Sequence, residues 1–440
     1  MRRPVTLRPI FTPGDGTVPG PRGAAGLGWA LAALAAAGTG ALAARAPALA
    51  VGMLALLGAA IVVVTASRLV LVQLLLGALP WLLVLDAFVP PLVRTAATGI
   101  AAVALVAFAL PLRYQRALGP IGAGVFAVVV LAHAVVATDV EQLKQAASYM
   151  IFPVVALAVL SERGRNELPR VRNAVFASGF AAMVVHLLVA ASGVGAGDTK
   201  YGVGEKLGFA AEAPHEMALL SVVIAAAALT MSERVSVRAG LFTVAALPAL
   251  LTGVRSAMLS VALILLVMLI ESRADRRSVA VVGIALALAI AGGAGAVLTE
   301  RLSETFRSGA TAETASSSRT AIWGVALDLW ADSGPPGWVL GAGLRSVPEA
   351  ELFELGVPYI GHSDIIEVGV QIGGLGLLAW LLVWAALFRA GLRTMLLIPV
   401  VVYAVVNGAI GYVAPLTLAL VLAAACRRDA DRTPRLARDG

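Results

Sequence analysis

Long apolar runs recur along almost the whole chain, and the short gaps between them hold most of its arginines. A helix that crosses a bilayer needs about 20 consecutive apolar residues, and these runs approach that length. A soluble domain carries about 25% charged residues, whereas this chain has 13% charged and 60% hydrophobic residues. Because backbone polar groups in lipid must be paired within their own segment, the runs are predicted to be helices. The predicted fold class is all-α, a polytopic transmembrane helix bundle.

We predict about 12 to 14 spans from the number and length of the runs. The runs cover residues 25–44, 47–66, 69–87, 95–112, 120–138, 146–160, 173–193, 214–231, 239–253, 256–270, 278–298, 366–388, 394–409 and 413–426. The lower number allows for shorter or re-entrant elements within 239–270 and 394–426. The predicted organisation is a disordered cytoplasmic tail at 1–24, one transmembrane domain at 25–426 and a second cytoplasmic tail at 427–440.

The distribution of arginine predicts the orientation of the spans. If both termini are cytoplasmic, the inner loops collect 23 of the 30 arginines, as the positive-inside rule requires. We therefore expect a multi-pass protein of the cytoplasmic membrane with a long outer loop at 298–365 and a shorter one at 194–213. The net charge of +7 is interpreted as a topology signal, and no nucleic-acid partner is expected.

Two arginines on the predicted outer side are candidates for binding an anion. Arg255 lies in a tight link between two apolar runs, where it either lines a polar cavity or, as an ordinary loop residue, extends to lipid head groups. Arg319 follows Ser318 and precedes apolar residues at helical spacing, including Trp323 and Trp330. This pattern predicts an amphipathic helix at the outer interface with Arg319 in its first turn. Such a helix either takes part in function or only covers the surface.

A histidine and a carboxylate stand together where the long outer loop ends, as His362-Ser363-Asp364 before an apolar run. Histidine titrates near neutral pH, and a neighbouring carboxylate favours its charged form, so His362 is a candidate general base. The sequence holds no Walker A motif, no Asp-x-Asp in an outer loop and no convincing metal-ligand cluster. Neither a metal nor a cofactor is expected. Arginines with a histidine suit an anionic lipid-phosphate donor.

Residues 208–387 resemble the superfamily of O-antigen ligases and O-antigen polymerases. The matching pieces, in family order, are Gly208-Phe209, Pro214-His215-Glu216-Met217-Ala218, Thr252-Gly253-Val254-Arg255, Ser318-Arg319 with Trp323, Gly341-Ala342-Gly343, His362-Ser363-Asp364 and Gln371-Ile372-Gly373-Gly374-Leu375-Gly376. The chain departs from the family pattern in three places. Ser363 and His215 stand where the family has asparagine, and Gln371 stands where it has glutamate; His215 and Gln371 are secondary site candidates.

The resemblance implies a metal-independent, inverting transfer of a glycan from an undecaprenyl-pyrophosphate carrier to a glycan or glycolipid acceptor at the outer face of the membrane. Carried over to this chain, Arg255 and Arg319 bind the pyrophosphate, His362 takes the proton of the acceptor hydroxyl, and Asp364 orients His362. The product is a cell-surface polysaccharide. Polymerase is slightly favoured over ligase, while the sugar, the linkage and the acceptor stay open.

The alternative function is a polysaccharide or lipid transporter or flippase. Such a protein is expected to carry ionisable or polar groups at mid-membrane along a pathway. The candidates are Gln73, His133, His186 and Asn407, which are scattered over four spans with no obvious charged partner. The polar residues of interest gather instead on one predicted face, which favours the transferase.

Overall fold

The computed structural model describes residues 68–84, 91–110, 112–191, 214–231, 234–252, 254–271, 280, 283–284, 319–355 and 363–427. The chain divides into two compact units, residues 1–71 and 72–440. In the first unit only Arg68–Leu71, the start of one helix, is described. The second unit holds all the other described residues.

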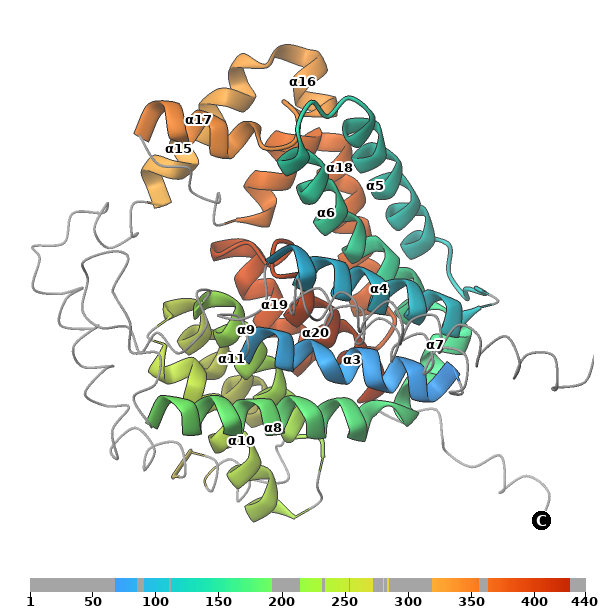
Figure 1. The fold of residues 1–440 in the computed structure, drawn as a ribbon, viewed down its shortest axis with the longest axis vertical. Helices are drawn as coiled ribbons and strands as arrows, with labels where there is room; N and C mark the ends of the chain where they lie inside the picture. Colours follow the sequence, from blue (N-terminus) through green and yellow to red (C-terminus); the bar gives the residue numbers. More distant parts are fainter. Residues whose placement is uncertain are drawn as a thin grey trace, which may run out of the picture. The chain divides into compact units, whose positions relative to one another are not determined.

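The described residues form helices joined by short turns, with no strand among them (Figure 1). The helices are α3 (Arg68–Val84), α4 (Pro91–Ala109), α5 (Leu118–Val135), α6 (Val140–Leu160), α7 (Glu162–Glu167), the 3₁₀ helix η2 (Leu168–Arg170), α8 (Arg172–Ala191), α9 (Pro214–Ala228), α10 (Val235–Leu251), α11 (Arg255–Glu271), α15 (Arg319–Asp332), α16 (Gly334–Leu340), α17 (Ser346–Leu355), α18 (Asp364–Arg389), α19 (Thr394–Val406) and α20 (Val413–Ala425). The predicted all-α fold class is confirmed.

Most predicted spans within the described residues correspond to apolar helices. Among the described residues, four helices are long and apolar enough to cross a membrane: Leu118–Val135, Val140–Leu160, Arg172–Val189 and Asp364–Arg389. Seven shorter apolar helices, α3, α4, α9, α10, α11, α19 and α20, cover the other predicted runs that the structure describes. The predicted spans at 25–44 and 47–66, and nearly all of 278–298, lie outside the described residues. The polytopic bundle is confirmed, whereas the number of spans stays a prediction.

Helix α20 lies in the interior of the bundle. All 13 of its residues are buried, and it packs against α6, α9 and α19. A helix that is apolar on all sides is stable only where other helices surround it. The next apolar helix in the interior, α9, is likewise buried without interruption from Met217 onward. These two helices form the centre against which the site-bearing segments pack.

Small residues let α18 approach α5 closely, and aromatic rings connect it to α6. An added Cβ at Gly122 would lie 3.0 Å from the Ala379 carbonyl oxygen, and one at Gly119 would lie 2.9 Å from the Ala386 Cβ. Small residues at helix crossings are typical of membrane bundles, in which dispersion contacts drive association. Beyond the glycines, Phe152 of α6 stacks on Trp384 of α18 with ring centroids 5.7 Å apart. The position of α18 is therefore set along much of its length.

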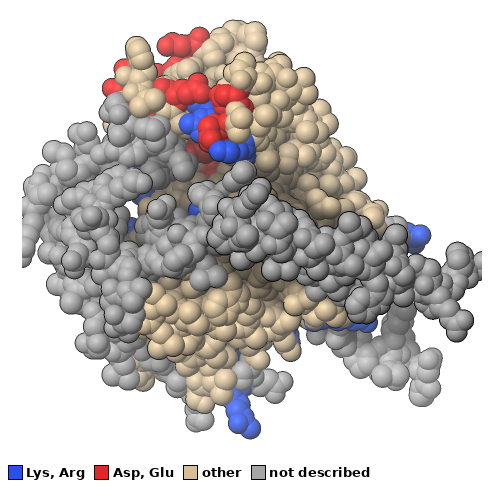
Figure 2. Space-filling model, in the orientation of Figure 1, with Lys and Arg blue, Asp and Glu red and all other residues tan. Residues whose placement is uncertain are grey.

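Helices α15, α16 and α17 lie together at one end of α18 (Figure 1). Ala326 of α15, Val347 of α17 and Val370 of α18 form a small buried core. The sequence placed Trp330 at head-group level; in the structure its ring lies against α18, 3.4 Å from where a Cβ on Gly369 would be. Acidic side chains with a few basic ones gather at this end of the described surface (Figure 2). In the first turn of α6, Glu141 pairs with Lys144 at 2.5 Å and with Arg345 at 3.7 Å.

Helix α18 is interrupted at Gly373, and the segment after α16 fills the interruption. Gly373 has φ 76°, outside the helical region. The backbone nitrogen of Ala342 donates to the Val370 carbonyl at 2.7 Å, and that of Gly343 donates to the Gln371 carbonyl at 3.1 Å. Gly341 has φ 93° and crosses the Gln371 backbone so closely that a Cβ would overlap it. The two glycine motifs of the sequence thus meet each other in the fold.

We expect Gly373→Ala to destabilise the protein, because alanine at φ 76° is strained and its Cβ would overlap the Val339 carbonyl. The left-handed backbone alone costs about 1–3 kcal/mol. The matched control is Gly124→Ala in α5, where nothing lies within 4 Å of an added Cβ. Thermal unfolding of the detergent-solubilised protein should show a lower Tm for Gly373→Ala only; equal Tm values would contradict the crossing.

Candidate functional site

The turn between α19 and α20 is the centre of the polar contacts that involve the predicted site residues. It runs from Asn407 to Tyr412, between the end of α19 at Val406 and the start of α20 at Val413. Asn407 is fully buried, and Gly408 has φ 76°, a conformation that glycine adopts without strain. The turn presents an asparagine side chain to the starts of neighbouring helices.

The Asn407 amide connects three of these helices. Its oxygen Oδ1 accepts from Arg319 Nη2 at 2.7 Å, where α15 begins. Its nitrogen Nδ2 donates to Ser256 Oγ in the first turn of α11, and it lies 3.4 Å from Nδ1 of His215 in the first turn of α9. Since an amide has distinct accepting and donating ends, these contacts fix its orientation.

Arg255 and Arg319 are the first residues of α11 and α15. The Arg319 guanidinium is half-buried, whereas the Arg255 side chain is exposed. Burial, followed by the positive charge of Arg255, lowers the pKa of Arg319, and Tyr412 acts in the opposite direction. The starts of two helices add partial positive charge near these side chains. The structure thus brings the two predicted phosphate-binding arginines into one electropositive region.

Asp364 has a contact that the sequence did not predict. It is the first residue of α18 and is 1% exposed, and both carboxylate oxygens accept from the Ile410 backbone nitrogen at 3.0 Å. The same turn that binds Arg319 through Asn407 is therefore held on its other side by Asp364. His362 lies outside the described residues, so its role as general base and its orientation by Asp364 stay predictions.

Gln371 belongs to a second polar cluster. Its Nε2 donates to the Tyr149 hydroxyl at 3.3 Å, and its Oε1 accepts from the Arg345 backbone nitrogen at 2.6 Å. The Tyr149 hydroxyl in turn donates to Glu367 Oε2 at 3.3 Å. Gln145 also accepts from the Arg345 backbone nitrogen, at 2.8 Å. Gln371 thus holds α6 and the Arg345 turn against α18, and its contacts are not with the two arginines.

An ion pair lies beside His215. Arg94 Nη1 of α4 is 3.1 Å from Oε2 of Glu216, with 13% and 19% of the two side chains exposed. The predicted run begins at residue 95, just after Arg94; the structure places Arg94 within α4, facing a carboxylate. Glu216 is therefore ion-paired with a residue of α4.

Sequence reasoning missed several members of these clusters, namely Ser256, Asn407, Tyr149, Glu367 and Arg345. Asn407 gave a signal in the sequence, because a polar side chain interrupts an apolar run there. It was considered only as part of a transport pathway. The other four are ordinary residue types at helix ends or inside spans, and the sequence pattern does not indicate their partners. Within the described residues, no three His, Cys, Asp or Glu side chains converge as a metal site would require.

Part of the chain matches a known protein family, and the match includes some of these polar groups. Residues 239–381 match the O-antigen ligase family. The resemblance indicated by the motifs is confirmed for this region, and the match supports membrane glycan transfer of the O-antigen ligase type. The matched segment contains Arg255, Arg319, His362, Asp364 and Gln371, whereas His215 and Asn407 lie outside it. None of the curated proteins matches this chain.

We expect Asp364→Ala to lower the stability of the protein, because it leaves the buried Ile410 N–H without its acceptor, a loss of about 1–3 kcal/mol. Asp364→Asn keeps one accepting oxygen and should lose less. The control is Glu354→Ala, which removes an exposed carboxylate from α17. The midpoint of thermal unfolding in detergent measures all three. If Asp364→Ala unfolds at the wild-type temperature, the carboxylate does not hold the turn.

Proposed function

We propose that the chain is a membrane glycosyltransferase that moves a glycan from an undecaprenyl-pyrophosphate carrier to a sugar acceptor at the outer face of the cytoplasmic membrane. The transfer needs no metal and inverts the anomeric carbon. The leaving group is the carrier pyrophosphate, so the enzyme must stabilise negative charge that grows on phosphate oxygens during the reaction.

The observation that carries this proposal is the meeting of Arg255 and Arg319 within the matched region. The positive charge of Arg255 acts on Arg319, and like charges held together raise the free energy of the empty site. A pyrophosphate between them relieves that repulsion and accepts hydrogen bonds from both guanidinium groups. Because Asn407 holds Arg319 in place before the donor binds, little reorganisation is needed when charge develops.

In the proposed mechanism, His362 takes the proton from the acceptor hydroxyl while that oxygen attacks the anomeric carbon. The next two residues, Ser363 and Asp364, are 3% and 1% exposed, and Asp364 is hydrogen-bonded to the turn that carries Asn407. The chain next to His362 and the Arg319 side chain are thus anchored to the same turn. This supports placing the base close to the phosphate-binding arginines.

Polymerisation is slightly favoured over ligation. The chain is rich in arginine and alanine and has three lysines, a composition typical of GC-rich bacterial genomes. If the host makes no lipopolysaccharide, the acceptor is a growing surface polysaccharide, another glycolipid or a protein. The topology proposed with this function has both termini in the cytoplasm.

The alternative function, a transporter or flippase, loses support from the partners of its candidate residues. The Gln73 amide donates to the Arg170 carbonyl at 3.1 Å, and His133 Nε2 lies 2.7 Å from the Leu340 carbonyl oxygen. Asn407 binds Arg319. These contacts hold different helices together and do not form a continuous pathway through the bundle.

We expect His362→Ala to lower transfer by about 10²–10⁴-fold, the usual contribution of a general base. Arg319→Lys should lower it by about 10–100-fold, because an ammonium cannot reproduce the two-pronged contact. The control is Arg170→Lys, in which the altered side chain is 64% exposed and pairs with Glu167. Mass spectrometry of polyprenyl-pyrophosphate glycans in a deletion strain, complemented with each variant, measures the effect.

Single repeat units that accumulate on the carrier identify a polymerase, and completed chains that accumulate identify a ligase. An unchanged carrier-linked pool in the deletion strain contradicts the transferase and returns the transporter to first place. If the strain carrying Arg319→Lys matches the Arg170→Lys control, the assignment of the phosphate site is wrong.

A further inference from the structure

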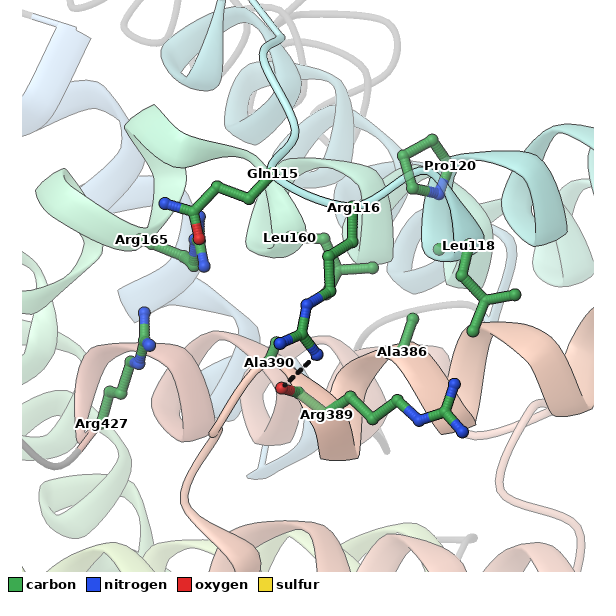
Figure 3. A pocket seen from close by; sticks show the side chains of 11 residues that line it. Gln115, Arg116, Leu118, Pro120, Leu160, Arg165, Ala386, Arg389, Ala390 and Arg427 are labelled. Atoms are coloured by element: carbon green, nitrogen blue, oxygen red, sulfur yellow. Dashed lines mark hydrogen bonds between the residues drawn. The ribbon is translucent and has the colours of Figure 1, made fainter.

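A second arginine cluster surrounds a cavity whose lining shares no residue with the candidate site. The cavity has a volume of about 300 Å³ and lies where α5 begins and where α6 and α18 end. Four arginines line it, namely Arg116, Arg165, Arg389 and Arg427. In the close view Arg116, Arg165 and Arg427 surround the space, and the Arg389 side chain extends away from them (Figure 3).

The helices and turns around the cavity hold these side chains in place. Gly119 lets α5 pack closely on Leu160 and Ala386, which also line the cavity. Arg116 Nη1 donates at 3.4 Å to the carbonyl of Arg389, the last residue of α18. Arg427 lies against the turn after α18, since its Nε is 3.7 Å from the position of a Cβ on Gly391.

Arginine is the charged residue type in the described lining of the cavity. Among the described residues no carboxylate lines it, and Glu162 is the acidic group that acts on Arg165. Burial, followed by the charges of Arg427 and Arg116, lowers the pKa of Arg165. The Arg165 Nε is buried and donates to no acceptor within the described residues.

The cavity lies at the opposite end of α18 from Asp364. Helix α5 packs along α18, and its 18 residues extend over about 27 Å at 1.5 Å per residue. This is close to the thickness of the hydrocarbon core of a bilayer, about 30 Å. Near the far end of α5, His133 Nε2 lies 2.7 Å from the carbonyl oxygen of Leu340, the last residue of α16. Both α5 and α18 are long and apolar enough to span a membrane. The cavity is therefore expected at the membrane interface remote from the candidate site, the cytoplasmic one in the proposed topology.

We propose that this arginine pocket binds a phosphate-bearing anion, and that the anion is the head group of an acidic phospholipid. Guanidinium groups bind phosphate oxygens two at a time, and basic pockets between spanning helices at the cytoplasmic face suit anionic head groups. The pocket lies where α5 begins and where α6 and α18 end, next to helices expected to contact the bilayer. A soluble phosphate or pyrophosphate is the other source of the same chemistry.

The test uses the full chain, purified in detergent, stripped of lipid and titrated with cardiolipin or with phosphatidylcholine, with native mass spectrometry as the readout. Wild type should retain cardiolipin in preference to phosphatidylcholine. Arg165→Gln and Arg427→Gln should each weaken cardiolipin retention about tenfold, the loss of one charge-assisted contact. The matched control is Arg113→Gln, which removes an exposed arginine from the same loop as Arg116 but outside the pocket lining.

A second arm titrates the same proteins with sodium pyrophosphate. Binding of pyrophosphate that Arg165→Gln abolishes, without cardiolipin preference, supports the anion pocket and assigns a soluble ligand. The proposal is overturned if neither probe binds, or if Arg113→Gln weakens binding as much as the pocket variants.

Thermal unfolding of each variant separates loss of binding from loss of fold. The two pocket variants come from α7 and from a residue just beyond the end of α20, so failure of one to fold leaves the other as the test. If both fold and both bind cardiolipin and pyrophosphate like wild type, the proposal is wrong. None of these outcomes depends on glycan transfer, so the pocket and the proposed function are tested independently.

Discussion

Backbone amide and carbonyl groups inside an apolar helix bundle must find hydrogen-bond partners, and this requirement is most demanding where a helix is interrupted. The interruption of α18 at Gly373 alters the pairing of nearby carbonyls, and the Gly341–Gly343 segment supplies donors for two of them. Because that segment connects α16 to α17, the pairing attaches α15, α16 and α17 to α18. Tyr149, Gln145 and Gln371 complete the attachment from the side of α6.

The turn between α19 and α20 also has a backbone N–H group that needs a partner, and a carboxylate supplies it. Within this turn, the Ile410 backbone nitrogen donates to Asp364. The side chain of Asn407, three residues before Ile410, accepts from Arg319. The start of α18 and the start of α15 are thereby fixed relative to one short segment. The two arginines lie in different parts of the sequence, and their proximity in space follows from this turn.

The sequence was sufficient for the all-α bundle and for the resemblance to the O-antigen ligase family at residues 239–381, because apolar runs and short motifs are local patterns. It also placed Arg319 correctly at the start of a helix, from the apolar spacing that follows it. It did not indicate that Gly341 and Gly373 cross, since a close approach of two backbones leaves no trace in periodicity. Nor did it reveal that Asp364 binds a backbone amide, because a carboxylate beside a histidine suggested a different partner. Trp330, which is amphipathic, was compatible with the lipid interface and with the α18 contact, and only packing distinguishes them.

The contact between Asn407 and Arg319 has a consequence for the charge of the site. A carboxylate at this position would orient the guanidinium equally well, but it would also neutralise it. The amide oxygen carries only a partial charge, so Arg319 is positioned while its full positive charge still acts on its surroundings. The second end of the amide is occupied by Ser256, next to the other arginine. A neutral side chain thus positions the Arg319 guanidinium and links it to the start of α11 without cancelling its charge.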